Sequence, residues 1–377
     1  MKKVLLFPAI FAAAMTVMAA CSEGTGKASD AEEADSETTT VADSAAVRAK
    51  ADSMTFAFVG DIMPGTTFPD TPKGAYLPSD SGKTLFADCR ELLLKADVAA
   101  GNCEGVLMEP GSPSKDCHNP KLCFTFRIPP YMTGPFTDAG FDFMNMANNH
   151  SEDFFSAGTK STFARLTEAG IASAGIEELN LTAVIERNGR KIGFAGFSTG
   201  GTTPSVIDIE EARRIVGELA KTCDIVVVAV HAGAEGTAYQ HVPRKMEIFH
   251  GWQRGDVYKF AHAVIDAGAD IVWGHGPHVV RGAELYKDRL VMYSLGNFCT
   301  PFRMNVTGST GVAPLITMTT DGEGRFLGGQ IHSFRQVKRV GPRHDPSGNA
   351  ATQIKSLSEA DFPESPLRIT STGALTR

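Results

Sequence analysis

Five short apolar runs in this chain each lead into polar side chains that can bind a metal ion. The runs cover residues 56–59, 97–100, 141–147, 225–230 and 271–273. Short apolar runs bounded by glycine or polar residues are typical of buried strands. In open α/β sheets, ligands bind outside the carboxyl ends of the strands. The sequence therefore predicts an α/β fold in which these five segments supply one shared site.

The side chains at the ends of these runs are aspartate, asparagine, glutamate and histidine. They are Asp61, Asn102, Glu104, Asn148, Asn149, His150, His231, Glu235, His275 and His278. The last two lie three residues apart around Gly276 and Pro277. In a tight loop this spacing can aim both imidazoles at one point, where they could bind a metal or a phosphate-like group. The alternative is separate structural roles, with Asp61 capping a turn and the histidines solvated.

The first 21 residues are typical of a bacterial lipoprotein signal peptide. A basic start, Met1 to Lys3, precedes an apolar segment, and small residues stand directly before Cys21. This resembles a lipobox, in which the cysteine carries lipid and becomes the mature N-terminus, although Met18 stands where leucine is usual. An ordinary cleavage site before a cysteine is the alternative. We expect an exported protein, anchored by lipid to the membrane of the bacterial cell envelope, facing the periplasm or the surface.

Residues 22–53 predict a disordered acidic tether, because they are rich in Ser, Thr, Ala, Asp and Glu and lack apolar periodicity. Residues 54–340 form the domain proper, and residues 341–377, where periodicity fades, are expected to be peripheral. Helices are expected over 84–95, over 156–169 and over 208–221, where Asp208 is a plausible cap. Two antiparallel strands, 313–319 and 326–334, close the domain.

The net charge indicates which binding partners the protein can have, and the cysteines indicate the redox state of its compartment. The formal net charge of −7 argues against a nucleic-acid surface. Cys117 and Cys123 bracket a proline-containing loop and could form a disulfide in an oxidising compartment. The surrounding segment, 110–130, carries Lys115, Lys121 and Arg127 and could reach over the site.

In order and spacing, these motifs resemble the CapA family of poly-γ-glutamate capsule synthesis proteins, which is related to calcineurin-like metallophosphatases. The motifs are Gly60-Asp61, Asn102-Cys103-Glu104, Asn148-Asn149-His150, His231 with Glu235, His275 to His278, and Tyr293 to Phe298. They lie between residues 55 and 300. The resemblance implies a four-layer α-β-β-α sandwich with the site at one edge of the sheets.

The resemblance also implies roles for individual residues. It makes His150 the catalytic histidine and Asn149, rather than Asn148, a metal ligand. The full set of metal-binding or metal-proximal positions is Asp61, Glu104, Asn149, His231, His275 and His278. Such mixed ligands suit one or two divalent ions of Mn, Zn or Fe. Met63 stands where metallophosphatases carry a further histidine, which puts a complete two-metal site in question.

Four residues are predicted to contact the substrate: Asn102, Glu235, Arg127 and Arg281. The arginines could hold an anionic envelope polymer or a phosphoester, whereas Glu235 could instead orient a histidine. Two functions remain open. One is a metal-dependent hydrolase or transferase of envelope polymer, and the other is a non-catalytic accessory that binds an anionic polymer during its synthesis or export.

Overall fold

The computed structural model describes residues 52–70, 76–116 and 123–377. The predictions for the signal peptide, for Cys21 and for most of the tether lie outside these residues, as do those for Cys117 and Lys121. Cys123 is disulfide-bonded. In the described part of the chain, no helix combines the length and the apolar character that a membrane span needs.

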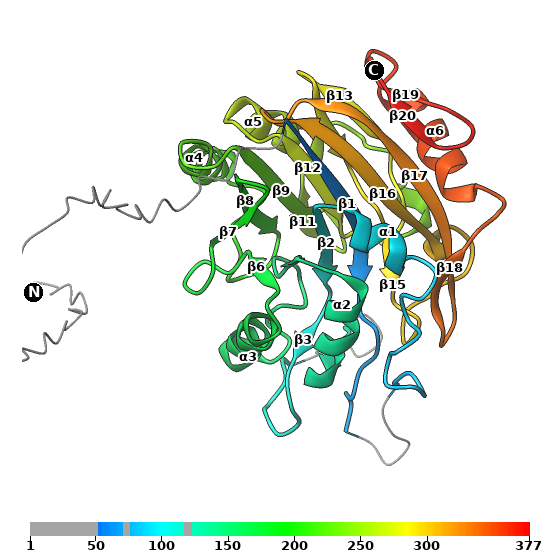
Figure 1. Cartoon of the computed structure of the whole chain (residues 1–377). Coiled ribbons are helices and arrows are strands. Elements are labelled where there is room, and N and C mark those ends of the chain that lie inside the picture. Colours follow the sequence, from blue (N-terminus) through cyan, green and yellow to red (C-terminus); the bar gives the residue numbers. More distant parts are fainter. Residues whose placement is uncertain (1–51, 71–75, 117–122) are drawn as a thin grey trace, which may run out of the picture. The chain divides into compact units, whose positions relative to one another are not determined.

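Two β-sheets form the centre of the domain (Figure 1). The larger sheet has the order β19-β20-β17-β16-β1-β2-β5-β6, with β15 paired to β1 and β18 paired to β17. Its strands are β1 (Ser53–Ile62), β2 (Val98–Cys103), β5 (Phe143–Asn145), β6 (Ala172–Ala174), β15 (Asn297–Cys299), β16 (Val312–Asp321), β17 (Phe326–Val337), β18 (Gly341–His344), β19 (Arg368–Ile369) and β20 (Ala374–Thr376).

The second sheet has the order β13-β14-β12-β9-β8-β7. Its strands are β7 (Thr182–Arg187), β8 (Arg190–Ser198), β9 (Ile225–His231), β12 (Ile271–His275), β13 (Ala283–Tyr286) and β14 (Arg289–Met292). Two small sheets pair β3 (Val106–Leu107) with β4 (Arg127–Ile128), and β10 (Glu247–Phe249) with β11 (Trp252–Gly255). The five predicted strand segments all belong to the two main sheets.

The two main sheets pack face to face through their apolar side chains. On β1 these side chains alternate, with Phe56 and Phe58 in the core between the sheets and Val59 in the core on the outer face. Across the inner core, the ring of Phe58 lies 5.5 Å from that of Trp273, whose indole N–H donates to the Val59 carbonyl at 2.9 Å. The inner core therefore joins the strands that carry the candidate site.

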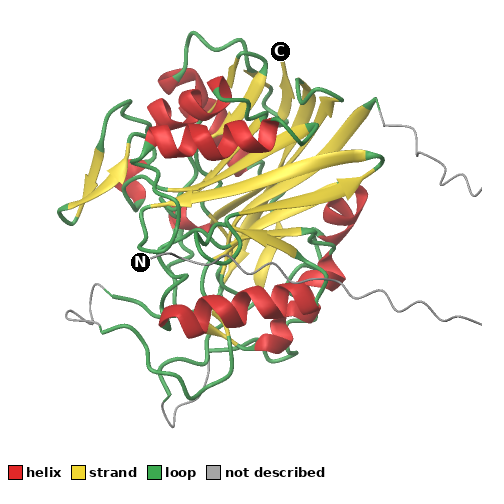
Figure 2. Cartoon of the chain, turned by 90° about the vertical axis from the view of Figure 1, so that its left-hand side faces the viewer, coloured by secondary structure: helices red, strands yellow, loops and turns green. Residues whose placement is uncertain are grey.

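Helices cover the outer faces of both sheets (Figure 2). The larger sheet is covered by α1 (Arg90–Lys95), α2 (Thr133–Ala139) and α3 (Phe155–Glu168), and the second by α4 (Ile209–Ala220) and α5 (Val257–Asp266). Asp208 caps α4 as predicted, since its carboxylate accepts the backbone N–H of Glu211 at 3.1 Å. This is the predicted four-layer α-β-β-α sandwich.

The C-terminal segment is part of the core, so the prediction that residues 341–377 are peripheral is wrong. Helix α6 (Asn349–Asp361) buries Ala350, Ile354 and Leu357 among the side chains between the sheets. Strands β19 and β20 extend the large sheet beyond β17. The predicted helix over 84–95 is also shorter than expected, because residues 79–89 form turns and only α1 is α-helical.

Candidate metal centre and catalytic histidine

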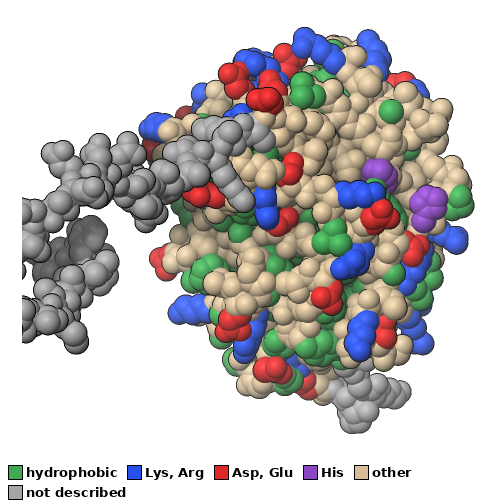
Figure 3. Space-filling view, in the orientation of Figure 1, with side chains coloured by type: hydrophobic (Ala, Val, Ile, Leu, Met, Phe, Trp, Pro, Cys, Tyr) green, Lys and Arg blue, Asp and Glu red, His purple; other side chains and the backbone are tan. Residues whose placement is uncertain are grey.

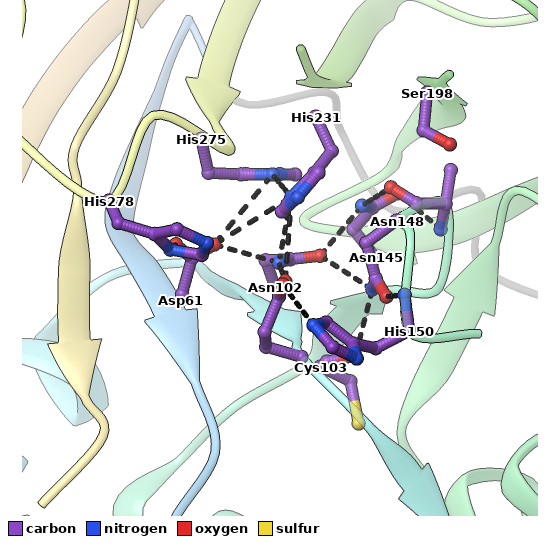
Figure 4. A network of polar contacts seen from close by, with 12 residues as sticks. Asp61, Asn102, Cys103, Asn145, Asn148, His150, Ser198, His231, His275 and His278 are labelled. Atoms are coloured by element: carbon purple, nitrogen blue, oxygen red, sulfur yellow. Dashed lines mark hydrogen bonds and ion pairs between the residues drawn. The ribbon is translucent and has the colours of Figure 1, made fainter. Parts of the chain in front are cut away.

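Parallel pairing aligns the strand ends within each sheet. In the second sheet, β9 and β12 place His231 directly opposite His275. In the large sheet, β1 and β2 place Asp61 opposite Asn102, and β5 places Asn145 opposite Asn102 on its other side. Figure 4 shows these side chains from both sheets pointing toward one another. The predicted convergence of strand ends therefore holds for all five segments, since His150 follows β5.

Asp61, His231 and His275 form a buried cluster that could hold a metal ion. One ligand atom from each lies within 4.8 Å of the others. Asp61 Oδ1 lies 3.8 Å from His231 Nδ1 and 4.0 Å from His275 Nδ1, and the two imidazole nitrogens are 3.0 Å apart. All three side chains are fully buried. A carboxylate with two imidazoles is a donor set that Zn²⁺, Mn²⁺ and Fe accept.

Asn102 lies at the centre of the cluster and connects its members. Its amide Nδ2 donates to Asp61 Oδ1 at 2.8 Å and to Glu104 Oε2 at 2.5 Å, and lies 3.4 Å from His231 Nδ1. Its oxygen accepts from the amides of Asn145 at 2.9 Å and Asn148 at 3.2 Å. The side chain predicted to contact substrate is therefore held on both ends by protein groups.

Burial sets the protonation of the cluster. Burial, and then the charge of Asp61, raise the pKa of Glu104 well above its usual value. Burial lowers the pKa of His275 to about 4, and burial followed by the neighbouring His275 lowers the pKa of His231 well below its usual value. Both imidazoles are therefore neutral near pH 7, the state that binds metal.

The donor set fits a cation. Buried polar atoms that lack a hydrogen-bond partner within the described residues include Glu104 Oε1, His231 Nε2 and His275 Nε2. Buried groups of this kind are costly unless something binds them. Two carboxylates, Asp61 and Glu104, share a site with neutral imidazoles, and a divalent cation would compensate their charge.

His278 binds the other oxygen of Asp61. Its Nδ1 lies 2.9 Å from Asp61 Oδ2 and 3.1 Å from Asn297 Oδ1. Burial opposes its charged form, but the hydrogen bond and the charge of Asp61 outweigh burial and raise the pKa of His278 to about 9. Without a cation beside it, His278 is thus a charged partner of Asp61, and its predicted role as a ligand requires loss of that proton.

His150 approaches the cluster from the large sheet. Its Nε2 lies 3.9 Å from Glu104 Oε1, and its Nδ1 lies 2.9 Å from Asp153 Oδ2. Asn148 is held in place, because its amide donates to the Cys103 carbonyl and its oxygen accepts the His150 backbone N–H. The buried Oδ1 of Asn149 has no hydrogen-bond partner among the described residues. That unpaired oxygen supports Asn149 as the ligand of the two, which stays a prediction.

The two arginines predicted to bind substrate are instead structural, which corrects that prediction. Arg127 is buried, donates to Thr67 Oγ1 at 2.8 Å and forms an ion pair with Asp70. Arg281 is buried and donates to both oxygens of Glu247, at 2.8 and 2.7 Å. Both guanidinium groups already have protein acceptors, so neither is available to an anionic substrate.

Glu235 also has a protein partner, since its carboxylate lies 3.0 Å from Arg254 Nη2. Arg254 in turn donates to the Gly233 carbonyl at 2.8 Å, so the pair holds the loop that follows His231. Met63 is fully buried, and its backbone N–H donates to the carbonyl of Cys299.

The sequence interpretation missed Asn145, Asp153 and Asn297. Asn145 could have been found from the sequence, because it is an amide side chain within an apolar strand.

Comparison with known proteins places the chain in a family. Residues 55–301 match the family model described as "Bacterial capsule synthesis protein PGA_cap". The chain belongs to this family. The CapA resemblance predicted from the motifs is confirmed.

Two curated relatives of this PGA_cap chain have names that refer to the synthesis of PGA or of polyglutamine. It is 27% identical over 264 residues to "PGA biosynthesis protein CapA" of Bacillus subtilis, covering 66% of this chain and 63% of that protein. It is 29% identical over 177 residues to a "Probable polyglutamine synthesis accessory protein" of Mycobacterium tuberculosis, covering 40% of this chain and 43% of that protein. The chain thus spans less than two thirds of the length of these relatives.

Among solved structures, the calcineurin-like phosphoesterase YfkN from Bacillus subtilis is similar to this chain, with a TM-score of 0.43 and 11% sequence identity. The match covers 81% of this chain and 97% of that chain.

Proposed function

We propose that this protein is a metal-dependent hydrolase or transferase that acts on an anionic polymer of the cell envelope, of the poly-γ-glutamate kind, or on a phosphoester. The observation that carries the proposal is the buried cluster of Asp61, His231 and His275, whose ligand atoms lie within 4.8 Å of one another. Membership of the capsule synthesis family supports the polymer as the substrate class.

The cluster would hold the ion through Asp61, His231 and His275, with Glu104 and Asn149 contributing oxygens from the second and third strand ends of the large sheet. Such a set suits Mn²⁺, Zn²⁺ or Fe, as one ion or two. A bound ion would polarise the scissile group and lower the pKa of a water molecule toward neutrality. The chain itself supplies the burial that excludes bulk water, because every side chain of the three-residue cluster is inaccessible.

His150 would donate a proton to the leaving group. Its Nε2 faces Glu104, and Nδ1 is bound to Asp153, so Nε2 is the nitrogen turned toward the cluster. The imidazole is only 6% exposed, which shields the proton transfer from solvent. A positioned general acid of this kind accelerates a reaction roughly a hundredfold or more.

Binding of an anionic substrate should depend on the metal. Arg127 and Arg281 already form ion pairs with Asp70 and Glu247. Asp61 and Glu104 place carboxylates in the site. Without a cation, the site offers an anion no free positive charge, because the imidazole of His278 is already paired with Asp61 Oδ2. The attraction for an acidic polymer would then come from the ion itself, so chelation should remove binding as well as turnover.

The alternative is an accessory that binds polymer without cleaving it. The mycobacterial relative carries the word accessory in its name. The amide of Asn102 lies between Asp61 and Glu104 and donates to both. These hydrogen bonds stabilise the two carboxylates without a cation. Met63, where metallophosphatases carry a histidine, also favours this second function.

The deciding experiment measures metal content and turnover on the same samples of full-length protein, with a generic phosphoester and with poly-γ-glutamate. His275→Ala should lose both metal and turnover. His150→Ala should keep its metal and lose roughly a hundredfold in rate. His241→Ala is the control, because this exposed histidine pairs with Asp361 outside the site and should change neither. Metal-loaded wild type that cleaves neither substrate but binds polymer would favour the accessory function.

We also propose export and a lipid anchor at Cys21, in the envelope of a bacterium, on the grounds of the signal segment in the sequence. The relative from Bacillus anthracis is named "Capsule biosynthesis protein CapA", which is consistent with an envelope location.

A further inference from the structure

A further buried arginine, Arg254, lies beside the loop that leaves the candidate metal cluster. It stands in β11, where its side chain is buried. Its Nε donates to the Gly233 carbonyl at 2.8 Å, and its own backbone carbonyl accepts the Gly233 N–H at 2.8 Å. Gly233 comes two residues after His231. These two bonds therefore hold the guanidinium group close to the carboxyl end of β9.

The outer nitrogens of Arg254 are incompletely bonded. Its Nη2 is buried and has no hydrogen-bond partner within the described residues, although it lies 3.0 Å from Glu235 Oε1 in an ion pair. Its Nη1 donates to Thr199 Oγ1 at a long 3.4 Å. In contrast, Arg281 donates through all three of its nitrogens, at 2.7 to 3.2 Å. Buried N–H groups without acceptors are costly, so Arg254 has capacity for a further acceptor.

The ion pair of Arg254 and Glu235 lies within electrostatic range of the metal cluster. Burial lowers the pKa of His231, and the positive charge of Arg254 lowers it further. Burial likewise raises the pKa of Glu104, and the negative charge of Glu235 raises it further. An acceptor that binds Arg254 would therefore lie next to the groups that hold the metal.

Glu235 is the more exposed member of the pair. Its side chain is 26% exposed, whereas that of Arg254 is 9% exposed. Among the residues that the structure describes, no hydrogen bond holds the Glu235 carboxylate in addition to this ion pair. Ion pairs that reach the surface are weak, typically about 1 kcal/mol or less. A carboxylate or a phosphate group can therefore replace Glu235, because a guanidinium group binds either of them through two N–H groups.

The charges on the protein surface make an individual binding residue important. On the face shown in Figure 3, Lys and Arg side chains are interspersed with Asp and Glu side chains. The formal net charge of the chain is −7. The overall field of the protein therefore gives an anion little attraction, and its recognition depends on single cations near the site.

We propose that Arg254 is the anion-binding residue of the site, and that Glu235 occupies its guanidinium group until a carboxylate or phosphate group of the substrate displaces it. The proposal rests on the proposed function in one respect, namely that the anion belongs to the substrate. A purely structural pair, which only holds the loop after His231, is the competing explanation. The two explanations differ when the charge of Glu235 is removed, because a structural pair leaves no anion site behind.

The test measures binding of inorganic phosphate and of poly-γ-glutamate to full-length, metal-free protein by isothermal titration calorimetry at low salt. Wild type should bind weakly, because its Arg254–Glu235 pair is neutral overall. Glu235→Gln removes the carboxylate that is paired with Arg254. This variant should bind one of the two anions about tenfold more tightly than wild type, which corresponds to about 1.4 kcal/mol.

Glu364→Gln is the matched control. It changes the net charge equally, but it removes the partner of Arg244 in an ion pair outside the site. Its affinity for both anions should stay within about twofold of wild type. If Glu235→Gln binds neither anion more tightly than this control, the proposal is overturned.

The gain in affinity must also depend on the guanidinium group. In the Glu235→Gln background, Arg254→Gln should return the affinity to within about twofold of wild type, and a retained gain would overturn the proposal. If that variant does not fold because it loses the bond to Gly233, Arg254→Lys takes its place. Lysine keeps the charge but lacks the paired N–H groups, so most of the gain should still be lost. A larger gain for phosphate would assign the anion to a phosphoester, and a larger gain for poly-γ-glutamate would assign it to the carboxylates of the polymer.

The metal-loaded protein provides a separate readout. If wild type turns over a substrate, Arg254→Lys should raise KM about tenfold while the metal content stays within about twofold. An unchanged KM would overturn the proposal. If wild type turns over neither substrate, the proposed function fails, whereas calorimetry of the metal-free protein still decides whether Arg254 binds an anion.

Discussion

The buried pair of Arg281 and Glu247 offers a measurable test of whether Arg281 is structural or binds substrate. The Arg281 side chain has no exposed surface and that of Glu247 is 5% exposed. Glu247 also accepts the backbone N–H of Ala234 at 2.9 Å, three residues after His231. The pair therefore holds the loop that leaves the candidate metal site.

Glu247→Gln removes the charge and keeps the shape. Breaking a buried ion pair by removing one partner costs about 3–5 kcal/mol, because the other charge stays buried without compensation. Arg281 keeps its bonds to the carbonyls of Tyr239 and Ala234, and the glutamine oxygen can still accept one N–H. We therefore expect the lower end, a loss of about 3 kcal/mol in the free energy of unfolding.

Urea unfolding of the full-length protein measures the loss, followed by the fluorescence of buried Trp273. Glu364→Gln is the control, because its pair with Arg244 is exposed and should be worth less than about 1 kcal/mol. The double variant Glu247→Leu with Arg281→Met should lose less than Glu247→Gln, since no charge stays buried. If Glu247→Gln loses no more than the control, the reasoning is refuted and Arg281 becomes available for an anionic substrate again.

Three further predictions follow from the site, from a buried acid and from the N-terminus. Mn²⁺ or Zn²⁺ at a hundredfold excess over Kd should stabilise the protein by about 2.7 kcal/mol in thermal unfolding. His275→Ala should abolish this shift, and no shift in wild type with either ion would contradict the metal site. Burial raises the pKa of Asp270 from 3.8 to about 6 against the opposing bond from the Val226 N–H and the charge of Arg289. The pKa of Asp270 is higher in the folded than in the unfolded state, so the protonated carboxyl group favours folding. This stabilisation is fully present below pH 3.8 and is lost as the pH rises to about 6. Relative to Asp270→Asn, wild type should lose about 3 kcal/mol over this range in urea unfolding, and parallel pH curves would count against it. Radiolabelled palmitate should enter wild type but not Cys21→Ala, and equal labelling of both would exclude the anchor.

Much of the fold could be predicted from the sequence because its signals are local. The apolar run that became β9 ends at His231, and the run that became β12 leads to His275. A strand and the polar residue that follows it can both be recognised from neighbouring residues in the sequence alone. The cap at Asp208 is equally local, because it joins residues three apart.

The functions of the charged residues were not predictable in the same way. Arg127 and Arg281 look alike in sequence whether they bind a ligand or a carboxylate of the protein, and their partners, Asp70 and Glu247, lie 57 and 34 residues away. Asp153 was missed although it is near His150 in sequence, because only the turn between them brings its carboxylate to Nδ1.

The sequence by itself determined which segments are strands, that their ends carry metal-capable side chains, and which family they resemble. Only the tertiary structure decided that His231 stands opposite His275, that Asn102 fills the space between Asp61 and Glu104, and that α6 packs between the sheets. Strand formation depends on periodicity along the chain, whereas register, burial and pairing of charges depend on which distant segments pack together.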